Sequence, residues 1–209
     1  MLRASLLALS LALSAMPSLA SAEVPPLRVM ELSRQLFEAG QAARDPLLMV
    51  TAARLRKGVS LEAVARAGSA GEAVEGAAPL GWEEMLEAAE AAAGEDAAML
   101  SVIGDIRASA TKGVSTGPVY SISRLEGNKT DTYQPFPFDG GKYAEVYVEG
   151  ARDSDLNLYV YDAQGMLVCA DTDVSEVAYC GWRPAESADF TVMVENKGAA
   201  TNRYSLMTN

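Results

Sequence analysis

Histidine is missing from the whole 209-residue chain. Its absence excludes Ser-His-Asp triads, Cys-His pairs and zinc sites built on histidine. The sequence also lacks a GxSxG nucleophile motif, a Walker loop and a dinucleotide-binding glycine motif. Paired carboxylates remain as a catalytic arrangement, that of a carboxylate-based hydrolase, with Glu83-Glu84 or Asp153 and Asp155 as candidates. Such pairs on an acidic protein usually lie on solvated surface, so we expect no enzyme.

Basic residues are also few. The chain has 17 Lys and Arg against 28 Asp and Glu, which gives a formal net charge of −11. A surface of this sign repels phosphate backbones, so it argues against nucleic acid as a partner. The simplest interpretation of the excess acid is solubility, and cation binding is the alternative.

No apolar run long enough to cross a membrane follows residue 22. Before that point, Arg3 precedes a short apolar stretch at residues 6–13, and Ala20-Ser21-Ala22 has the small-x-small pattern of a signal-peptidase site. We therefore predict a signal peptide over residues 1–22, with a retained membrane anchor as the alternative. No cysteine lies near this point, which argues against lipid attachment. We expect a bacterial protein in the periplasm or outside the cell, without membrane insertion.

Four segments carry apolar residues at helical spacing, at about residues 28–39, 46–57, 82–93 and 96–111. They predict a small helical bundle as an N-terminal domain over residues 23–112. Between the two pairs of helices, residues 59–80 are typical of a flexible connector or a partly ordered flap. Residues 113–118 are rich in Gly, Ser and Pro and predict a linker between two domains.

The C-terminal part centres on a predicted β-hairpin. Leu156, Leu158 and Val160 alternate with polar and tyrosine positions, as in a strand with one face in a core. Residues 162–165 supply the turn and residues 166–169 return. We expect Trp182 to cap one end of the core, whose other members are Phe136, Ala144, Val146, Val148, Leu156, Leu158, Val160, Leu167, Phe190, Val192, Val194 and Leu206.

Several ordered segments carry a family resemblance: Asp131-Thr132-Tyr133 with Phe136, residues 140–148, the hairpin, Trp182-Arg183-Pro184, residues 190–196 and Tyr204-Ser205-Leu206. Over about residues 119–209 the chain resembles the bacterial pre-peptidase C-terminal domain; the N-terminal helical region resembles no family that we recognise. The resemblance implies a small β-sandwich of the kind that accompanies catalytic domains without carrying the catalysis. The expected fold is α+β with two domains, a helical bundle followed by a jelly-roll-like antiparallel β-sandwich.

The two cysteines, Cys169 and Cys180, both fall in the β module. In an exported protein we expect them to form a disulfide, across paired strands joined by a turn at residues 171–173. A metal-binding or redox pair is the alternative, although the spacing is not CxxC.

Two groups of residues are candidate sites. The first is acidic and could supply the oxygen ligands that calcium needs, unless these residues only form turns. It consists of Asp153, Asp155, Asp162, Asp171 and Asp173, with Glu176 nearby. The second group is Tyr147, Tyr159 and Tyr161, which the strand phase points away from the core. These tyrosines could form a ligand-binding face, pack against the helical domain or stabilise cross-strand pairs.

The sequence thus indicates a non-catalytic exported protein that binds an unidentified protein or polysaccharide. An accessory module that assists the secretion, folding or stability of a separate secreted enzyme is one alternative. A calcium-binding β-sandwich is another, and calcium is the only cofactor that we consider.

Overall fold

The computed structural model describes residues 24–110, 117–151 and 154–209. The predicted signal peptide, residues 113–116 of the predicted linker, and Asp153 lie outside these ranges. Within them, no helix combines the length and the apolar character needed to span a membrane.

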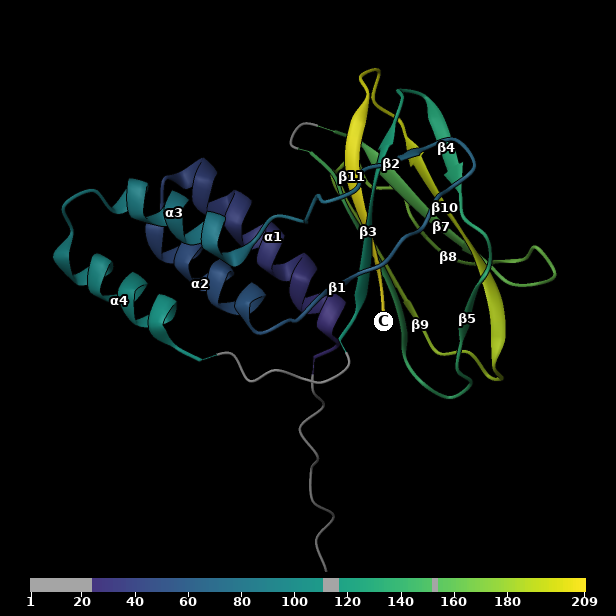
Figure 1. Cartoon of the computed structure of the whole chain (residues 1–209), viewed down its shortest axis with the longest axis horizontal. Helices are drawn as coiled ribbons and strands as arrows, with labels where there is room; N and C mark the ends of the chain where they lie inside the picture. The colour runs from purple at the N-terminus through teal and green to yellow at the C-terminus, as the bar shows by residue number, and fades with distance from the viewer. Residues whose placement is uncertain (1–23, 111–116, 152–153) are drawn as a thin grey trace, which may run out of the picture.

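Four helices form the part of the molecule drawn at the left of Figure 1, as predicted: α1 (Pro26–Ala43), α2 (Pro46–Lys57), α3 (Trp82–Ala93) and α4 (Ala97–Ala108). The start of α2 follows from its sequence, because Asp45 Oδ1 accepts the Leu47 amide at 2.9 Å and the Leu48 amide at 3.3 Å. The helices enclose an apolar core of their own, formed by Phe37, Met49, Val50, Ala52, Ala53, Met85, Leu86, Ala89, Ile103 and Ile106.

The strands form a sandwich of two sheets, so the predicted fold class is confirmed. The first sheet has the order β1-β3-β11-β6-β9, with β2 also paired to β3. Its strands are β1 (Glu62–Ala63), β2 (Glu72–Ala73), β3 (Val119–Leu125), β6 (Ala144–Glu149), β9 (Val177–Trp182) and β11 (Asn202–Thr208). The second sheet has the order β4-β10-β7-β8, with β5 also paired to β10. Its strands are β4 (Lys129–Thr132), β5 (Phe136–Phe138), β7 (Leu156–Tyr161), β8 (Leu167–Asp171) and β10 (Ala188–Asn196).

The core between the sheets contains the predicted residues with one exception. Leu167 is 55% exposed. The pairing of β7 with β8 shifts register between Val160 and Tyr161, so Cys169 lies opposite Val160 while Leu167 lies opposite Tyr161. Such a shift moves a side chain to the other face of a strand, and a strictly alternating pattern cannot anticipate it. Trp182 packs against Phe138 with ring centroids 4.9 Å apart, at one end of the core.

The predicted disulfide between Cys169 and Cys180 is present, but it does not join paired strands. Cys169 lies on β8 and Cys180 on β9, the outermost strands of two different sheets. The bond therefore closes one side of the sandwich by linking sheet to sheet. The prediction of a cross-strand bond was wrong because the turn between the cysteines carries the chain from one sheet to the other.

Residues 59–80 connect α2 to α3, as expected, but they form an ordered strap across the opposite side of the sandwich and not a flexible connector or a partly ordered flap. The strap pairs with β3 twice, in parallel through Glu62-Ala63 and antiparallel through Glu72-Ala73. Between these points, Gly68 bridges to Tyr133, next to the end of β4 in the second sheet. In Figure 1 the strap leaves α2, passes in front of β3, turns near β4 and returns to α3.

A buried carboxylate holds the middle of the strap. Asp131 is fully buried on β4 and accepts hydrogen bonds from the Ala70 amide at 3.0 Å and the Tyr204 hydroxyl at 2.7 Å. A Cβ atom at Gly68 would lie 1.9 Å from Asp131 Oδ1, and one at Gly71 would lie 2.2 Å from Oδ2. Glycine is therefore required at both positions for the strap to approach the carboxylate this closely.

The helices dock on the outer face of the first sheet through α1. Leu27 and Met30 are buried there against Tyr147, Val177 and Met207. The carboxylate of Glu145, on β6, accepts the Leu27 amide at 3.4 Å and the Arg28 amide at 3.0 Å, so the sheet caps the first turn of α1. Burial raises the pKa of Glu145. Because α1 has no side-chain cap of its own, this contact supplies what the local sequence lacks.

A buried ion pair reinforces this interface. Arg56 on α2 is 3% exposed and donates to Glu149 on β6 through two contacts, of 2.7 and 3.0 Å. The same carboxylate accepts the Tyr147 hydroxyl at 2.9 Å and lies 3.5 Å from the Arg34 guanidinium. Arg56 also donates to the Leu80 carbonyl at 2.7 Å, which ties the end of the strap to the junction.

Candidate binding face

Of the three predicted tyrosines, Tyr147 does not belong to an exposed face. It is fully buried on β6 of the first sheet, beneath α1. The strand phase was read correctly, because the side chain does point away from the sandwich core. The prediction of a ligand contact is nevertheless wrong for Tyr147, because the helices occupy that side of the sheet.

Tyr159 and Tyr161 lie on β7 of the second sheet, and both are partly exposed. The alternation of burial along β7 and β10 places them with Thr191, Met193 and Glu195 on the outer side of that sheet. Register confirms the grouping, since Tyr159 lies opposite Met193 and Tyr161 opposite Thr191. The main contacts between helices and strands are those of α1 with β6 and β9, and both strands belong to the first sheet. We call this surface the open face; Asn157, which precedes Tyr159 on the same side of β7, is buried at its edge.

A polar cluster occupies one end of the open face. Glu195 Oε2 accepts the Tyr159 hydroxyl and the Asn157 amide nitrogen, both at 3.1 Å. Lys197 Nζ lies 3.5 Å from the other oxygen of Glu195. Burial raises the pKa of Tyr159, and the Glu195 carboxylate adds to the rise. The cluster joins the Tyr159 hydroxyl to the Glu195 carboxylate, both on partly exposed residues, while Asn157 is buried.

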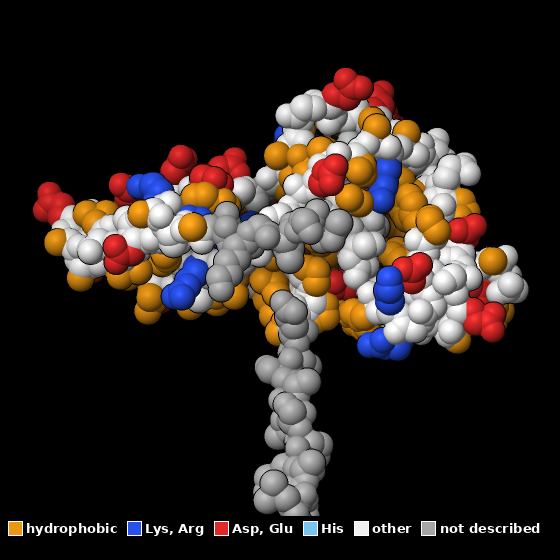
Figure 2. Space-filling view, turned by 60° about the horizontal axis from the view of Figure 1, so that its bottom comes forward, with side chains coloured by type: hydrophobic (Ala, Val, Ile, Leu, Met, Phe, Trp, Pro, Cys, Tyr) orange, Lys and Arg blue, Asp and Glu red, His pale blue; other side chains and the backbone are white. Residues whose placement is uncertain are grey.

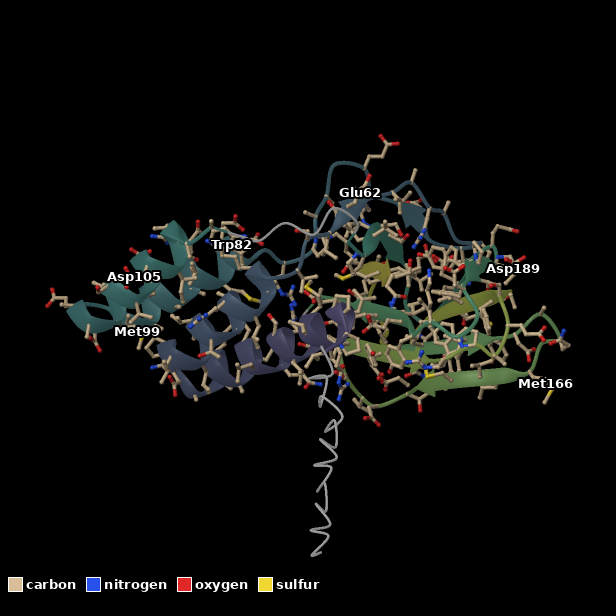
Figure 3. The ribbon with its side chains drawn as sticks, turned by 90° about the horizontal axis from the view of Figure 1, so that it is seen from below. Glu62, Trp82, Met99, Asp105, Met166 and Asp189 are labelled. Atoms are coloured by element: carbon tan, nitrogen blue, oxygen red, sulfur yellow. A yellow bond between two sulfur atoms is a disulfide. The ribbon has the colours of Figure 1, made fainter. Side chains whose placement is uncertain are left out.

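A shallow depression of about 490 Å³ lies at the other end of the open face. Tyr161, Thr191 and Met193 line it together with Pro135, Asp189 and the turn between β7 and β8. The turn leads to an exposed apolar tip, where Met166 is 66% and Leu167 55% exposed. Figure 3 shows Met166 and Asp189 at the end of the sandwich that lies farthest from the helices. The open face is thus most exposed at this end, whereas Asn157 at the other end is buried.

Two of the predicted acidic residues, Asp162 and Asp171, accept hydrogen bonds from backbone amides. Asp162 Oδ1 accepts the amides of Gln164 at 2.9 Å and Met166 at 2.8 Å, and Asp171 accepts the Tyr179 amide at 2.8 Å. Asp173 is exposed, whereas Oδ1 of Asp155 is buried without a hydrogen-bond partner among the described residues. Within those residues no three acidic or cysteine side chains gather as a metal site would require. On the face drawn in Figure 2, acidic side chains are spread over both the helices and the sandwich. Calcium binding stays a prediction.

Glu83 and Glu84, the first pair of carboxylates considered for catalysis, stabilise the start of a helix. Glu83 and Glu84 lie in the first turn of α3, where acidic residues favour the helix dipole. Glu84 Oε2 accepts the Gly81 amide at 2.6 Å, so this carboxylate caps the helix. The partner of Asp155 in the other candidate pair, Asp153, lies outside the described residues.

Sequence reasoning missed half of the open face. Thr191, Met193 and Glu195 alternate along β10 with the correctly predicted core residues Phe190, Val192 and Val194. The alternation was therefore a usable signal for outward position. It could not tell that β10 pairs with β7 and brings these side chains beside the two tyrosines.

No family model and no curated protein matches the chain. Among solved structures, the pre-peptidase C-terminal domain of a collagenase from Bacillus anthracis is 15% identical with a TM-score of 0.36, covering 43% of this chain and 87% of that one. The CBM22-1 xylan-binding domain of Paenibacillus barcinonensis Xyn10C is 10% identical with a TM-score of 0.25, covering 47% and 88%. The structure of TmCBM61 with β-1,4-galactotriose is 14% identical with a TM-score of 0.27, covering 42% and 66%. Each of these structures matches less than half of this chain.

Proposed function

We propose that the chain is a non-catalytic exported binding module whose open face binds an extended polysaccharide. The observation that carries the proposal is the contrast between the two outer faces of the sandwich. One is covered by α1, which buries Tyr147 completely, while the other leaves Tyr159 and Tyr161 accessible. Aromatic side chains left accessible on a regular sheet are suited to contact a partner, because they offer a large contact area at low entropic cost.

The chemistry of the open face favours a sugar polymer. A tyrosine ring can pack against the apolar CH face of a sugar, while the partly exposed Glu195 carboxylate can accept hydrogen bonds from sugar hydroxyls. The two tyrosines lie two residues apart on one strand, about 6.6 Å by the rise of a strand, which is comparable to the length of a sugar unit. A linear chain laid along β7 could therefore contact both rings.

Export is supported by the disulfide. The bond between Cys169 and Cys180 is typical of proteins that fold in an oxidising compartment. Insoluble and extracellular polysaccharides are encountered there, so the proposed ligand and the proposed location agree.

The test is electrophoresis of the mature chain, which is residues 23–209 without the predicted signal peptide. The gels contain soluble xylan, mixed-linkage β-glucan or galactan. We expect at least one polymer to retard the protein, and the double variant Tyr159→Ala/Tyr161→Ala to lose at least about tenfold in affinity, as for central aromatic contacts elsewhere. A matched control is Tyr120→Phe, which alters a tyrosine on the helix-covered sheet. Failure of all three polymers to retard the wild type, or equal retardation of the double variant, contradicts the proposal. Binding to an immobilised protein such as fibrillar collagen instead would replace the polysaccharide with a protein ligand.

A further inference from the structure

A second concave site lies far from the open face, where the helices, the strap and the first sheet meet. It is a cleft of about 320 Å³. Phe37 of α1 and Ile122 of β3 supply apolar walls, and Ser205 and Arg203 of β11 contribute from the sheet. Glu84 completes the polar part of the lining from the first turn of α3. Segments distant in the sequence, from α1, α3, β3 and β11, thus converge on one cleft.

The deep carboxylate of the cleft is already neutralised. Glu149 accepts two contacts from Arg56 and one from Tyr147, and it lies 3.5 Å from Arg34. It therefore contributes little unmet negative charge to the cleft, and a ligand meets the charges nearer the surface.

Arg203 is the cation of this site that has no ion-pair partner among the described residues. Within the described part of the chain, no hydrogen-bond or ion-pair partner is found for its guanidinium, and the residue is exposed. Its cross-strand neighbour is Arg124, a like charge directly opposite. Arg124 in turn has Glu72 opposite it on the strap, whereas Arg203 has no acidic neighbour in that row. Like charges in this arrangement destabilise a sheet, and an anion beside Arg203 would relieve the repulsion.

Glu84 offers the complementary group. Its Oε2 is occupied by the Gly81 amide at 2.6 Å, and no donor among the described residues contacts Oε1. A ligand that places an anion at Arg203 can thus donate a hydrogen bond to Glu84 and lay an apolar surface against Phe37 and Ile122. A bare inorganic anion meets only the first of these requirements.

We propose that this cleft binds a small hydroxylated carboxylate of the sugar-acid type, with the carboxylate paired to Arg203 and a hydroxyl donating to Glu84. Arginine suits this role because its planar guanidinium pairs with carboxylate through two hydrogen bonds. The site is separate from the open face, so it can be occupied whether or not a polymer is bound there.

The test is an amide-shift titration of the isotope-labelled mature chain with D-glucuronate into the millimolar range, with D-glucose as the neutral counterpart and inorganic phosphate as the bare anion. We expect saturable shifts at Phe37, Ile122 and Ser205 with glucuronate only. Arg203→Gln should raise the dissociation constant at least about tenfold, as loss of a charged hydrogen bond does. The control Arg54→Gln, at an exposed arginine on α2, should leave it unchanged.

Three results would each overturn the proposal: no saturable shift with glucuronate, equal shifts with glucose or phosphate, or equal affinity of Arg203→Gln and the wild type. The spectrum of each variant without ligand reports its fold, so loss of binding through misfolding is recognised directly. A gel-retardation result on the open face has no bearing on these outcomes.

Discussion

The two outer faces of the sandwich start from the same strand pattern and end in opposite roles. Tyr147 on β6 and Tyr159 on β7 both point away from the core, yet the first is fully buried and the second stays accessible. The difference arises from α1, which lies on one sheet and not on the other. Strand alternation therefore tells which side chains leave the core, whereas a distant segment decides whether they meet solvent.

The largest expected effect is the loss of stability on removing the buried tyrosine, compared with removing an accessible one. Tyr147→Ala removes a buried ring and the hydrogen bond to Glu149, and we expect a loss of about 3–5 kcal/mol in the free energy of unfolding, as for other large aromatic side chains. Tyr161→Ala should cost at most about 1 kcal/mol, the scale of a cross-strand pair. Urea denaturation measures both. Equal losses would show that the two faces are not different.

Removal of Arg56, which pairs with Glu149 between the helices and the first sheet, should lower the free energy of unfolding almost as much. Arg56→Met leaves the buried Glu149 without its closest cation, and we expect a loss of about 3–5 kcal/mol. The matched change Arg54→Met, at an exposed position on the same helix, should stay within about 0.5 kcal/mol. If the two variants had the same melting temperature, the ion pair would not hold the helices on the sheet.

The disulfide should affect both faces alike, because it joins the sheets themselves. The double variant Cys169→Ser/Cys180→Ser opens a loop with a sequence separation of 11 residues. We expect a loss of about 2–4 kcal/mol by the loop-entropy model, with polymer binding retained below the melting temperature. The check is a melt of the wild type with and without reductant beside the variant. Selective loss of binding without loss of stability would contradict this role.

The smallest expected effect is a pH dependence of the free energy of unfolding, which arises from Glu38 on α1. Burial, with the neighbouring Glu176, raises the pKa of Glu38 to about 7, while Arg34 opposes the rise. Between the ordinary pKa of a glutamate and about 7, the folded state holds a proton that the unfolded state has lost. The free energy of unfolding must therefore fall as pH rises through this window.

Replacing Glu38 isolates that contribution. Glu38→Gln should flatten the fall between about pH 4.5 and 7 without abolishing it, since burial also raises the pKa of Glu31 and Glu145. Below this window the trend reverses for Glu176, whose pKa is lowered by hydrogen bonds from Glu38 and Arg34 that outweigh its burial. Melting temperatures across pH for the wild type and the variant measure the effect. Identical slopes would exclude Glu38 as a source.

Local chemistry was enough to predict much of the fold. Asp45-Pro46 starts a helix by its own capping, the alternation from Leu156 to Tyr161 gives a strand with its faces assigned, and the two cysteines were paired correctly. Each of these depends on residues close in the sequence or on a single covalent possibility.

The remainder depends on contacts that no local pattern encodes. Glu145 caps a helix 117 residues away, through the Arg28 amide, and the same docking buries Tyr147. The strap pairs through Glu62-Ala63 and Glu72-Ala73, residue types with no preference for strands, so its partner β3 imposes the conformation. Half of the open face, contributed by β10, became visible only through its pairing with β7.

The most direct test of the central claim is an amide-shift map of the labelled mature chain with the soluble polymer that retards it most in the gel. We expect shifts confined to β7, β10 and the turn between β7 and β8, including Tyr159, Tyr161 and Met193, with β6 and α1 unchanged. Shifts centred on α1 and the first sheet, or no shifts on β7, would contradict it.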